Sequence, residues 1–126
     1  MWTQDELDQV GDAEELQVSS RREDGSLRPF VTIWVARVGD ELFVRSAHGP
    51  DNPWYVRALK SSKGRIRAGR VERDVEFDHL DAQSDAALIS AVDDAYSQKY
   101  RDQGPALVAS VSGEPLHELT IRLLAT

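Results

Sequence analysis

One short stretch of the sequence, residues 42–57 (LFVRSAHGPDNPWYVR), gathers side chains that suit an anion joined to a planar ring. Arginine offers a planar fork of N–H donors, serine adds a hydroxyl, and glycine lets the backbone approach an oxyanion closely. A tryptophan can stack on a ring. The candidate binding residues are Arg45, Ser46, His48, Gly49, Trp54 and Arg57. We expect the first four to surround the anion, with Trp54 over the attached ring.

These residues also have a purely structural interpretation. Arg45 is expected to lie opposite Trp34 in a strand pair, where the two side chains could stack without any ligand. Trp54 and Tyr55, at the start of a helix, could equally pack in the core or at a dimer contact. Both interpretations stay open at the level of sequence.

Other chemistries find little support. The chain has no cysteine, which excludes thiol catalysis and thiolate metal sites. His48, His79 and His117 have no partners at metal-ligand spacing, and Ser46 lacks the surroundings of a nucleophilic serine. No Gly-rich phosphate-binding motif occurs. The sequence therefore predicts no metal site and identifies no catalytic residue.

Size and charge limit the remaining classes. A chain of 126 residues that is 40% hydrophobic makes one domain, residues 1–126, with one core. A net charge of −7 argues against binding to nucleic acid or to an anionic membrane, because both need a basic surface. The start of the chain lacks the apolar run of a secretory signal, and no stretch approaches the ~20 apolar residues of a membrane span. We expect a cytoplasmic protein.

The local patterns place the candidate residues between a strand pair and a short helix. Residues 29–38 (PFVTIWVARV) are nearly all β-branched or aromatic, Gly39 opens a two-residue hairpin turn, and residues 41–47 form the second strand. Asn52 is a good helix cap and Pro53 a good first helical residue, so the helix begins there.

The rest of the chain supplies further strands and the main helix. Residues 64–80 predict a second hairpin that turns at Gly69, residues 84–100 the main helix, and residues 106–111 and 117–124 two final strands. In total we expect six to seven strands, one main helix and two short helices. This is an α+β protein whose antiparallel sheet curls into a barrel or half barrel.

Arg73 is unusual among the basic residues of the second hairpin. It alternates with apolar neighbours, whereas the acidic residues beside it point the other way. An arginine on the apolar side needs a carboxylate partner or a ligand. We expect the partner to be Asp93 or Asp94 of the main helix.

The segments WVARVGDELFVRSAHGPDNPWYVRA, GRVERDVEF and DDAYSQKY resemble a family of small bacterial proteins known as domain of unknown function 2255. This likeness spans nearly the whole chain. The order of strand pair, R-S-x-x-G loop and W-Y helix is also similar to the flavin- and deazaflavin-binding split barrels. That superfamily includes the pyridoxamine phosphate oxidases and the deazaflavin-dependent nitroreductases.

The split-barrel resemblance implies a homodimer with FMN or a deazaflavin in a groove between subunits. It implies that the cofactor phosphate lies at the strand end where Arg45 and Ser46 stand. The lysine that usually follows this loop in the flavin enzymes has no clear counterpart here. Two functions stay open. One is a protein that binds a flavin-like cofactor or another small phosphate-bearing ligand, with reductase activity as its extension. The other is a non-catalytic dimeric interaction or ligand-binding module without a cofactor.

Overall fold

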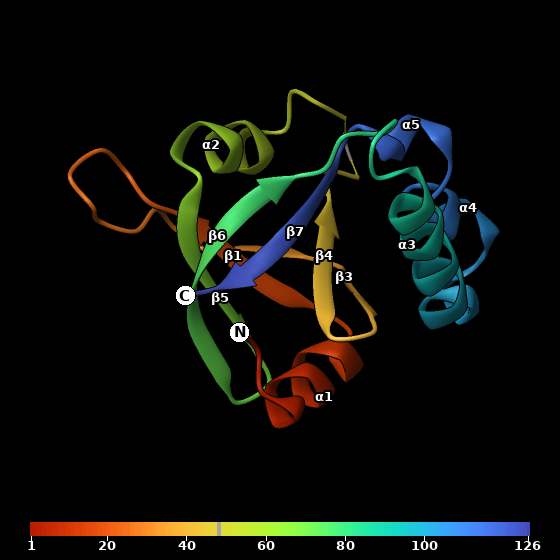
Figure 1. Cartoon of the computed structure of the whole chain (residues 1–126), viewed down its shortest axis with the longest axis horizontal. Helices are drawn as coiled ribbons and strands as arrows, with labels where there is room; N and C mark the ends of the chain where they lie inside the picture. The colour runs from red at the N-terminus through yellow and green to blue at the C-terminus, as the bar shows by residue number, and fades with distance from the viewer. Residues whose placement is uncertain (48) are drawn as a thin grey trace.

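Seven antiparallel strands curl into a nearly closed barrel in the computed structural model, which describes residues 1–47 and 49–126 (Figure 1). The strands are β1 (Leu16–Ser20), β2 (Val31–Ile33), β3 (Val35–Val38), β4 (Glu41–Arg45), β5 (Lys63–Ala68), β6 (Val71–His79) and β7 (Thr120–Ala125). Their order in the sheet is β2-β1-β5-β6-β7-β4-β3. The α+β split-barrel class predicted from the sequence is therefore confirmed.

Both predicted hairpins are present in the predicted register. Val38 pairs with Glu41 across the first turn, and Ala68 pairs with Val71 across the second. Gly39 and Gly69 adopt φ angles of 60° and 58°, a left-handed conformation that glycine takes without steric cost. These two turns fix which side chains of β3 to β6 face the inside of the barrel.

The helices lie at the ends and on one side of the barrel (Figure 1). They are α1 (Gln4–Asp12), α2 (Pro53–Ser61), α3 (Ala86–Lys99), α4 (Pro105–Ala109) and α5 (Glu114–His117), with a 3-10 turn, η1, at Arg101–Gln103. The Thr3 side chain and Glu6 form a capping box at α1, and Asn52 with Pro53 begins α2 as predicted. The expected strand over residues 106–111 is wrong, because Pro105 starts helix α4 directly after Gly104, which has a φ of 100°. The last strand begins at Thr120, after α5, rather than at residue 117.

The run predicted as one strand over residues 29–38 is divided at Trp34. Its first part, β2, pairs with β1, and its second part, β3, pairs with β4 at the other edge of the sheet. Helix α3 satisfies backbone groups at this crossing point: Tyr96 Oη donates to the Trp34 carbonyl at 3.2 Å, and Lys99 Nζ donates to the Val35 carbonyl at 2.8 Å. One chain segment therefore forms both edges, and Trp34 lies at the seam of the barrel.

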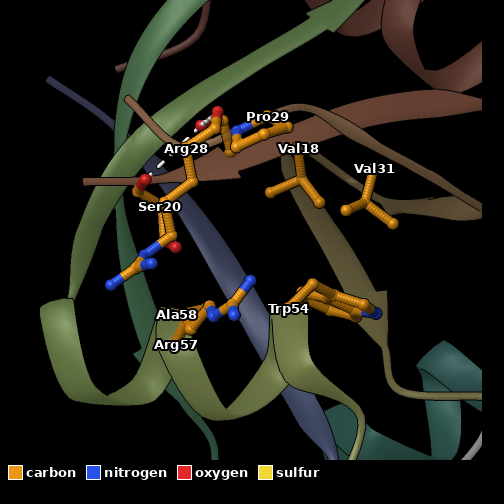
Figure 2. A pocket seen from close by; sticks show the side chains of 9 residues that line it. Val18, Ser20, Arg28, Pro29, Val31, Trp54, Arg57 and Ala58 are labelled. Atoms are coloured by element: carbon orange, nitrogen blue, oxygen red, sulfur yellow. Dashed lines mark hydrogen bonds between the residues drawn. The ribbon is translucent and has the colours of Figure 1, made fainter. Parts of the chain in front are cut away.

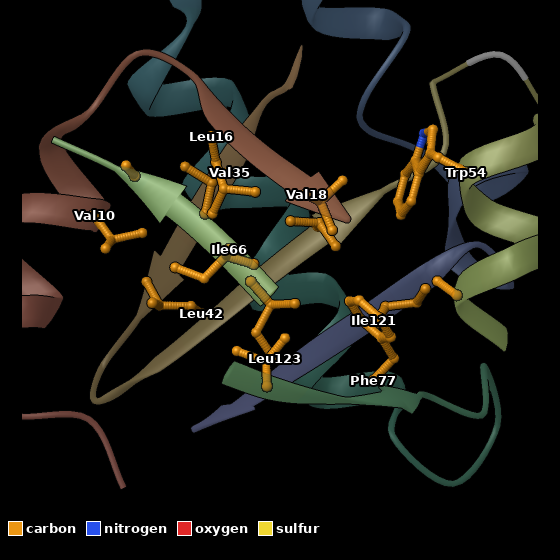
Figure 3. Packing of buried hydrophobic residues seen from close by; sticks show 14 of the residues in the cluster. Val10, Leu16, Val18, Val35, Leu42, Trp54, Ile66, Phe77, Ile121 and Leu123 are labelled. Carbon is orange, nitrogen blue, oxygen red and sulfur yellow. The ribbon is translucent and has the colours of Figure 1, made fainter. Parts of the chain in front are cut away.

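The apolar core has two parts on opposite sides of the curved sheet. The larger part fills the barrel and contains Leu42, Ile66 and Leu123 (Figure 3). Val10 of α1 closes one end of this interior and Trp54 of α2 the other (Figure 3). The smaller part lies between α3 and the outside of β3 and β4, and it is built on residues such as Phe43, Ile89 and Tyr96.

Arg73 does not pair with the main helix. Its Nη1 atom lies 2.8 Å from Glu6 Oε1 of α1, and its Nη2 atom donates to the Thr126 carbonyl. The expected partners Asp93 and Asp94 are thus wrong for this arginine. The physical reason is that Arg73 points toward the barrel end closed by α1, while α3 packs on the outside.

Two further properties concern the described part of the chain. No helix within residues 1–47 and 49–126 is both long and apolar enough to cross a membrane. Over the same ranges, the histidine, aspartate and glutamate side chains form no cluster of three or more suited to a metal ion.

Candidate functional site

Arg45 at the end of β4 is buried and held by the protein itself. Its Nε donates to Thr120 Oγ1 at 2.8 Å, and its Nη1 lies 2.5 Å from Asp93 Oδ1. Two carbonyl groups, of Val111 and Ile89, accept from Nη1 and Nη2. The guanidinium carries five N–H groups, and these contacts use four of them within the protein.

Asp93 links this arginine to the last turns of the structure. Its Oδ1 also accepts from the backbone N–H of Gly113, and its Oδ2 lies 2.7 Å from His117 Nε2. Partial burial alone would raise the pKa of the Asp93 carboxyl, but the hydrogen bonds from Arg45, His117 and Gly113 outweigh it and lower that pKa. Asp93 is therefore the carboxylate that Arg45 needs, and the predicted stacking of Arg45 on Trp34 does not appear. Instead, the Arg45 guanidinium lies 5.7 Å from the ring centre of Tyr96.

The loop after β4 contains the next three candidates. Ser46 is fully buried, and its Oγ donates to the Gly49 carbonyl at 2.5 Å. Gly49 has a φ of 88°, a conformation that suits glycine. His48 lies outside the described residues. The described part of this loop is thus closed by its own hydrogen bond.

A pocket of about 470 Å³ lies beside these residues, at the seam of the barrel. Its apolar lining consists of Val31, Ile33, Trp34, Trp54, Leu107 and Val111. Thr32, Asn52 and Ser110 add polar groups, and Arg45 and Ala47 reach its wall. The volume is in the range of small-molecule sites, and an apolar lining with a few polar groups is typical of them.

Two tryptophans give this pocket its aromatic walls. Trp34 is stacked on Tyr100, with ring centres 4.0 Å apart and planes within 2°. Tyr100 thus covers one face of the Trp34 indole, and the indole also lines the pocket. Trp54 is 6% exposed and makes an edge contact with Tyr55, as the structural interpretation of this pair predicted. Trp54 therefore belongs both to the core and to the pocket wall.

A second, smaller pocket of about 20 Å³ lies between β1 and α2 (Figure 2). Arg57 and Arg28 both line it, and their guanidinium groups lie in the gap between strand and helix. Trp54 and Val31 line this pocket as well as the larger one, so the two adjoin. Arg57 was a candidate from the sequence, whereas Arg28 was not. Arg28 lies in an irregular segment with no motif around it, so no local signal could have found it.

The geometry divides the predicted residues into two groups. Arg45 and Ser46 form hydrogen bonds within the protein. Trp54 and Arg57 line pockets, and their side chains form no hydrogen bond or ion pair with any described residue. Whether the first group contacts an anion stays a prediction, and both Arg45 and Trp54 line the larger pocket.

Residues 6–123 match the family described as an uncharacterized protein conserved in bacteria, DUF2255. The chain belongs to this family. The match confirms the family resemblance inferred from the sequence, and the description of DUF2255 names no ligand. No curated protein sequence matches this DUF2255 chain.

Solved structures share the fold of this DUF2255 protein at low identity. A FAD-binding protein from Mesorhizobium loti is 16% identical with a TM-score of 0.59, covering 99% of this chain and 91% of that one. HutZ, the heme storage protein from Vibrio cholerae, is 11% identical with a TM-score of 0.64, covering 100% and 92%. An F420 reductase is 14% identical with a TM-score of 0.54, covering 95% and 92%. At such identities the likeness shows the fold alone, and that fold is the split barrel.

Proposed function

We propose that this DUF2255 protein binds a flavin-type cofactor, FMN or a deazaflavin, with the ring system in the pocket between Trp34 and Trp54. The observation that carries the proposal is the pocket itself: about 470 Å³, mostly apolar and walled by two indoles. A planar aromatic ring gains both apolar burial and stacking in such a space. The names of the FAD-binding protein and the F420 reductase with this fold support the choice of ligand class.

The hydroxyl and amide groups around the pocket suit the polar edge of such a ring. Thr32 and Asn52 supply donors and acceptors at its wall, and Ser110 supplies an acceptor, since its hydroxyl donates to the Leu107 carbonyl. The Asn52 side chain makes no capping hydrogen bond to α2, so its amide is available to a ligand. A bound flavin would supply hydride or electron transfer, and the reductase activity that we propose as an extension rests on that chemistry.

We further propose that the protein is a homodimer whose second copy covers this pocket. Val31 and Leu107, both on the pocket wall, are 40% and 49% exposed. A second copy laid over the mouth would bury these side chains and complete the site. Light scattering tests this assembly, and a mass near the 14.1 kDa of one chain across micromolar concentrations would contradict it.

A non-catalytic dimeric module is the second candidate. It is favoured by one observation: Arg45 and Ser46, which the split-barrel resemblance assigned to the cofactor phosphate, are engaged in internal hydrogen bonds. In this alternative the apolar rim of the pocket serves association alone.

Titration with FMN and with a deazaflavin distinguishes the two candidates. Binding between two indoles should quench tryptophan fluorescence and shift the visible absorption of the cofactor. The third tryptophan, Trp2, lies at the other end of the barrel near α1 and should contribute an unchanged background. A protein that is colourless and alters neither spectrum at millimolar cofactor would contradict the cofactor proposal and favour the module.

A further inference from the structure

Arg28 lines the smaller pocket, and its backbone is held by hydrogen bonds while its guanidinium forms no ion pair with any described residue. The backbone of Arg28 is tied at both sides, since its N–H donates to the Ser20 carbonyl at 3.0 Å and its carbonyl accepts from Ser19 Oγ at 2.5 Å. Its side chain makes no hydrogen bond or ion pair to any described residue, and its Nε is buried without an acceptor. A buried N–H of a charged group without a partner is costly, so it points to an acceptor supplied from outside.

A second arginine and a hydroxyl share this pocket. Arg57 of α2 extends into the same gap, and Ser20 of β1 lines it from the other side (Figure 2). None of the carboxylates in residues 1–47 and 49–126 lies within ion-pair distance of Arg28 or Arg57, although nine other such contacts occur in this part of the chain. Two guanidinium groups without ion-pair partners that line one pocket repel each other, and an anion between them removes that repulsion.

We propose that Arg28, Arg57 and Ser20 form an anion subsite that receives the phosphate of a ligand whose ring lies in the larger pocket. The position of the ring rests on the proposed function, whereas the binding of an anion by Arg28, Arg57 and Ser20 does not. The two pockets adjoin at Trp54 and Val31, so a ligand that filled both would extend past the Trp54 indole. The phosphate end is thus assigned to the gap between β1 and α2, on the other side of Trp54 from Arg45.

The present size of the gap determines how the subsite would fill. A volume of about 20 Å³ holds roughly one water molecule and not yet a phosphate. Arg28 is anchored through its backbone, whereas Arg57 is exposed on the surface of α2 and can swing outward. Binding therefore requires movement of the Arg57 side chain, which then closes on the anion.

A comparison of FMN with riboflavin tests the subsite, because the two share the ring and differ in the phosphate. For the natural protein we expect FMN to bind more tightly than riboflavin. In Arg28→Ala and in Arg57→Ala, FMN affinity should fall about 10- to 100-fold, the loss of one charge-assisted hydrogen bond, while riboflavin affinity should not change. Arg70→Ala is the matched control, since Arg70 is exposed in the β5–β6 turn and removes the same charge without touching either pocket.

The outcomes separate the subsite from the ring site. Equal losses for FMN and riboflavin, or no loss in either variant, would overturn the subsite while leaving the cofactor proposal standing. If the natural protein binds neither flavin, calorimetry with inorganic phosphate and pyrophosphate tests the subsite alone. Binding that both variants lose and Arg70→Ala keeps would support it, and no binding would overturn it. Circular dichroism of each variant shows whether it is folded. Arg57→Ala should stay folded, because the Arg57 side chain is exposed.

Discussion

Arg45 and Asp93 form an ion pair in which the arginine side chain is completely buried and the carboxylate is 23% exposed. Their atoms Nη1 and Oδ1 are 2.5 Å apart, although the residues are 48 positions apart in the sequence. The pair joins the end of β4 to the middle of α3, and it also holds the turn at Gly113 through the same carboxylate oxygen. It therefore connects the barrel to the helices that pack against its outside.

Arg45→Ala should strongly destabilise the fold. Removing one partner of a buried pair costs ~3 to 5 kcal/mol, because it leaves the other group and two carbonyl acceptors without their donor. Arg37→Ala is the control, since its pair with the exposed Asp8 is worth only ~0.2 to 1 kcal/mol. Urea unfolding of both variants measures the difference. Equal stability of the two variants would show that Arg45 is not a structural residue.

Lys99 should make stability depend on pH in the alkaline range. Burial lowers the pKa of its ammonium group from 10.5 to about 8 in the folded protein. Between these two values the unfolded chain binds more protons than the folded one, so stability rises with pH there and the burial penalty is fully present below pH 8. Lys99→Met removes this contribution. Relative to that variant, the natural protein should gain stability as the pH rises from 8 to 10.5.

The natural protein has to be compared with the Lys99→Met variant, because Tyr100 changes the pH dependence of stability in the opposite direction. Burial raises its pKa from 10.0 to about 12, so its contribution is lost as the pH rises above 10. This effect is common to both proteins and cancels in the difference. A stability difference that stays constant from pH 7 to 10.5 would contradict the prediction for Lys99.

Gly64→Ala should disrupt the pairing of β1 with β5. A Cβ atom at this position would overlap the Ser19 carbonyl oxygen and lie 2.8 Å from the ring of Phe77. Neither neighbour can move easily, because Ser19 belongs to the paired strand and Phe77 to the core. We expect a loss of at least ~1 to 3 kcal/mol, measured by thermal melting. Gly25→Ala, at an open loop position with a φ of 88°, should cost only the ~1 to 2 kcal/mol of its left-handed conformation.

Leu107→Asp should weaken FMN binding at the pocket without unfolding the protein. Leu107 lines the larger pocket and is 49% exposed in the single chain, so a carboxylate there leaves the core intact but places a charge against the apolar ring. We expect about a tenfold loss of affinity in a fluorescence titration. Leu59→Asp is the matched control, because Leu59 is 37% exposed on α2 and lines neither pocket. A loss of the same size in both variants would indicate a general effect of charge.

Local signals in the sequence were enough to predict the barrel. The turns at Gly39 and Gly69 and the start of α2 at Asn52 each depend on the conformational preferences of a few neighbouring residues. The error at residues 106–111 has a local cause as well. Alternating small and apolar residues resemble a strand, but Pro105 sets the backbone for a helical turn.

The candidate site could be predicted only in part, because its polar partners are distant in sequence. The type of Arg45 indicates a carboxylate or an anion, but nothing in the sequence around it identifies Asp93. The same is true of Arg73, whose partner Glu6 is 67 positions away. The aromatic wall was easier to predict from the sequence, since the predicted start of α2 at Asn52 places Trp54 in its first turn.

One chain segment forms both edges of the sheet, and the larger pocket lies where this segment passes from β2 to β3. A ligand in the pocket can therefore stabilise the closed barrel. Thr32 of β2, Trp34 at the crossing from β2 to β3, and Arg45 at the end of β4 line that pocket. A ligand held there would contact β2 at one edge and the end of β4 beside the other edge, so its binding free energy would add to the cost of opening the barrel along its seam. Amide hydrogen exchange should therefore slow in β2 and β1 as the pocket is saturated, while the closed β5–β6 hairpin keeps its rate. A bound cofactor would therefore stabilise the closed form of the barrel at the one place where, in the described part of the chain, its two edges are not hydrogen-bonded to each other.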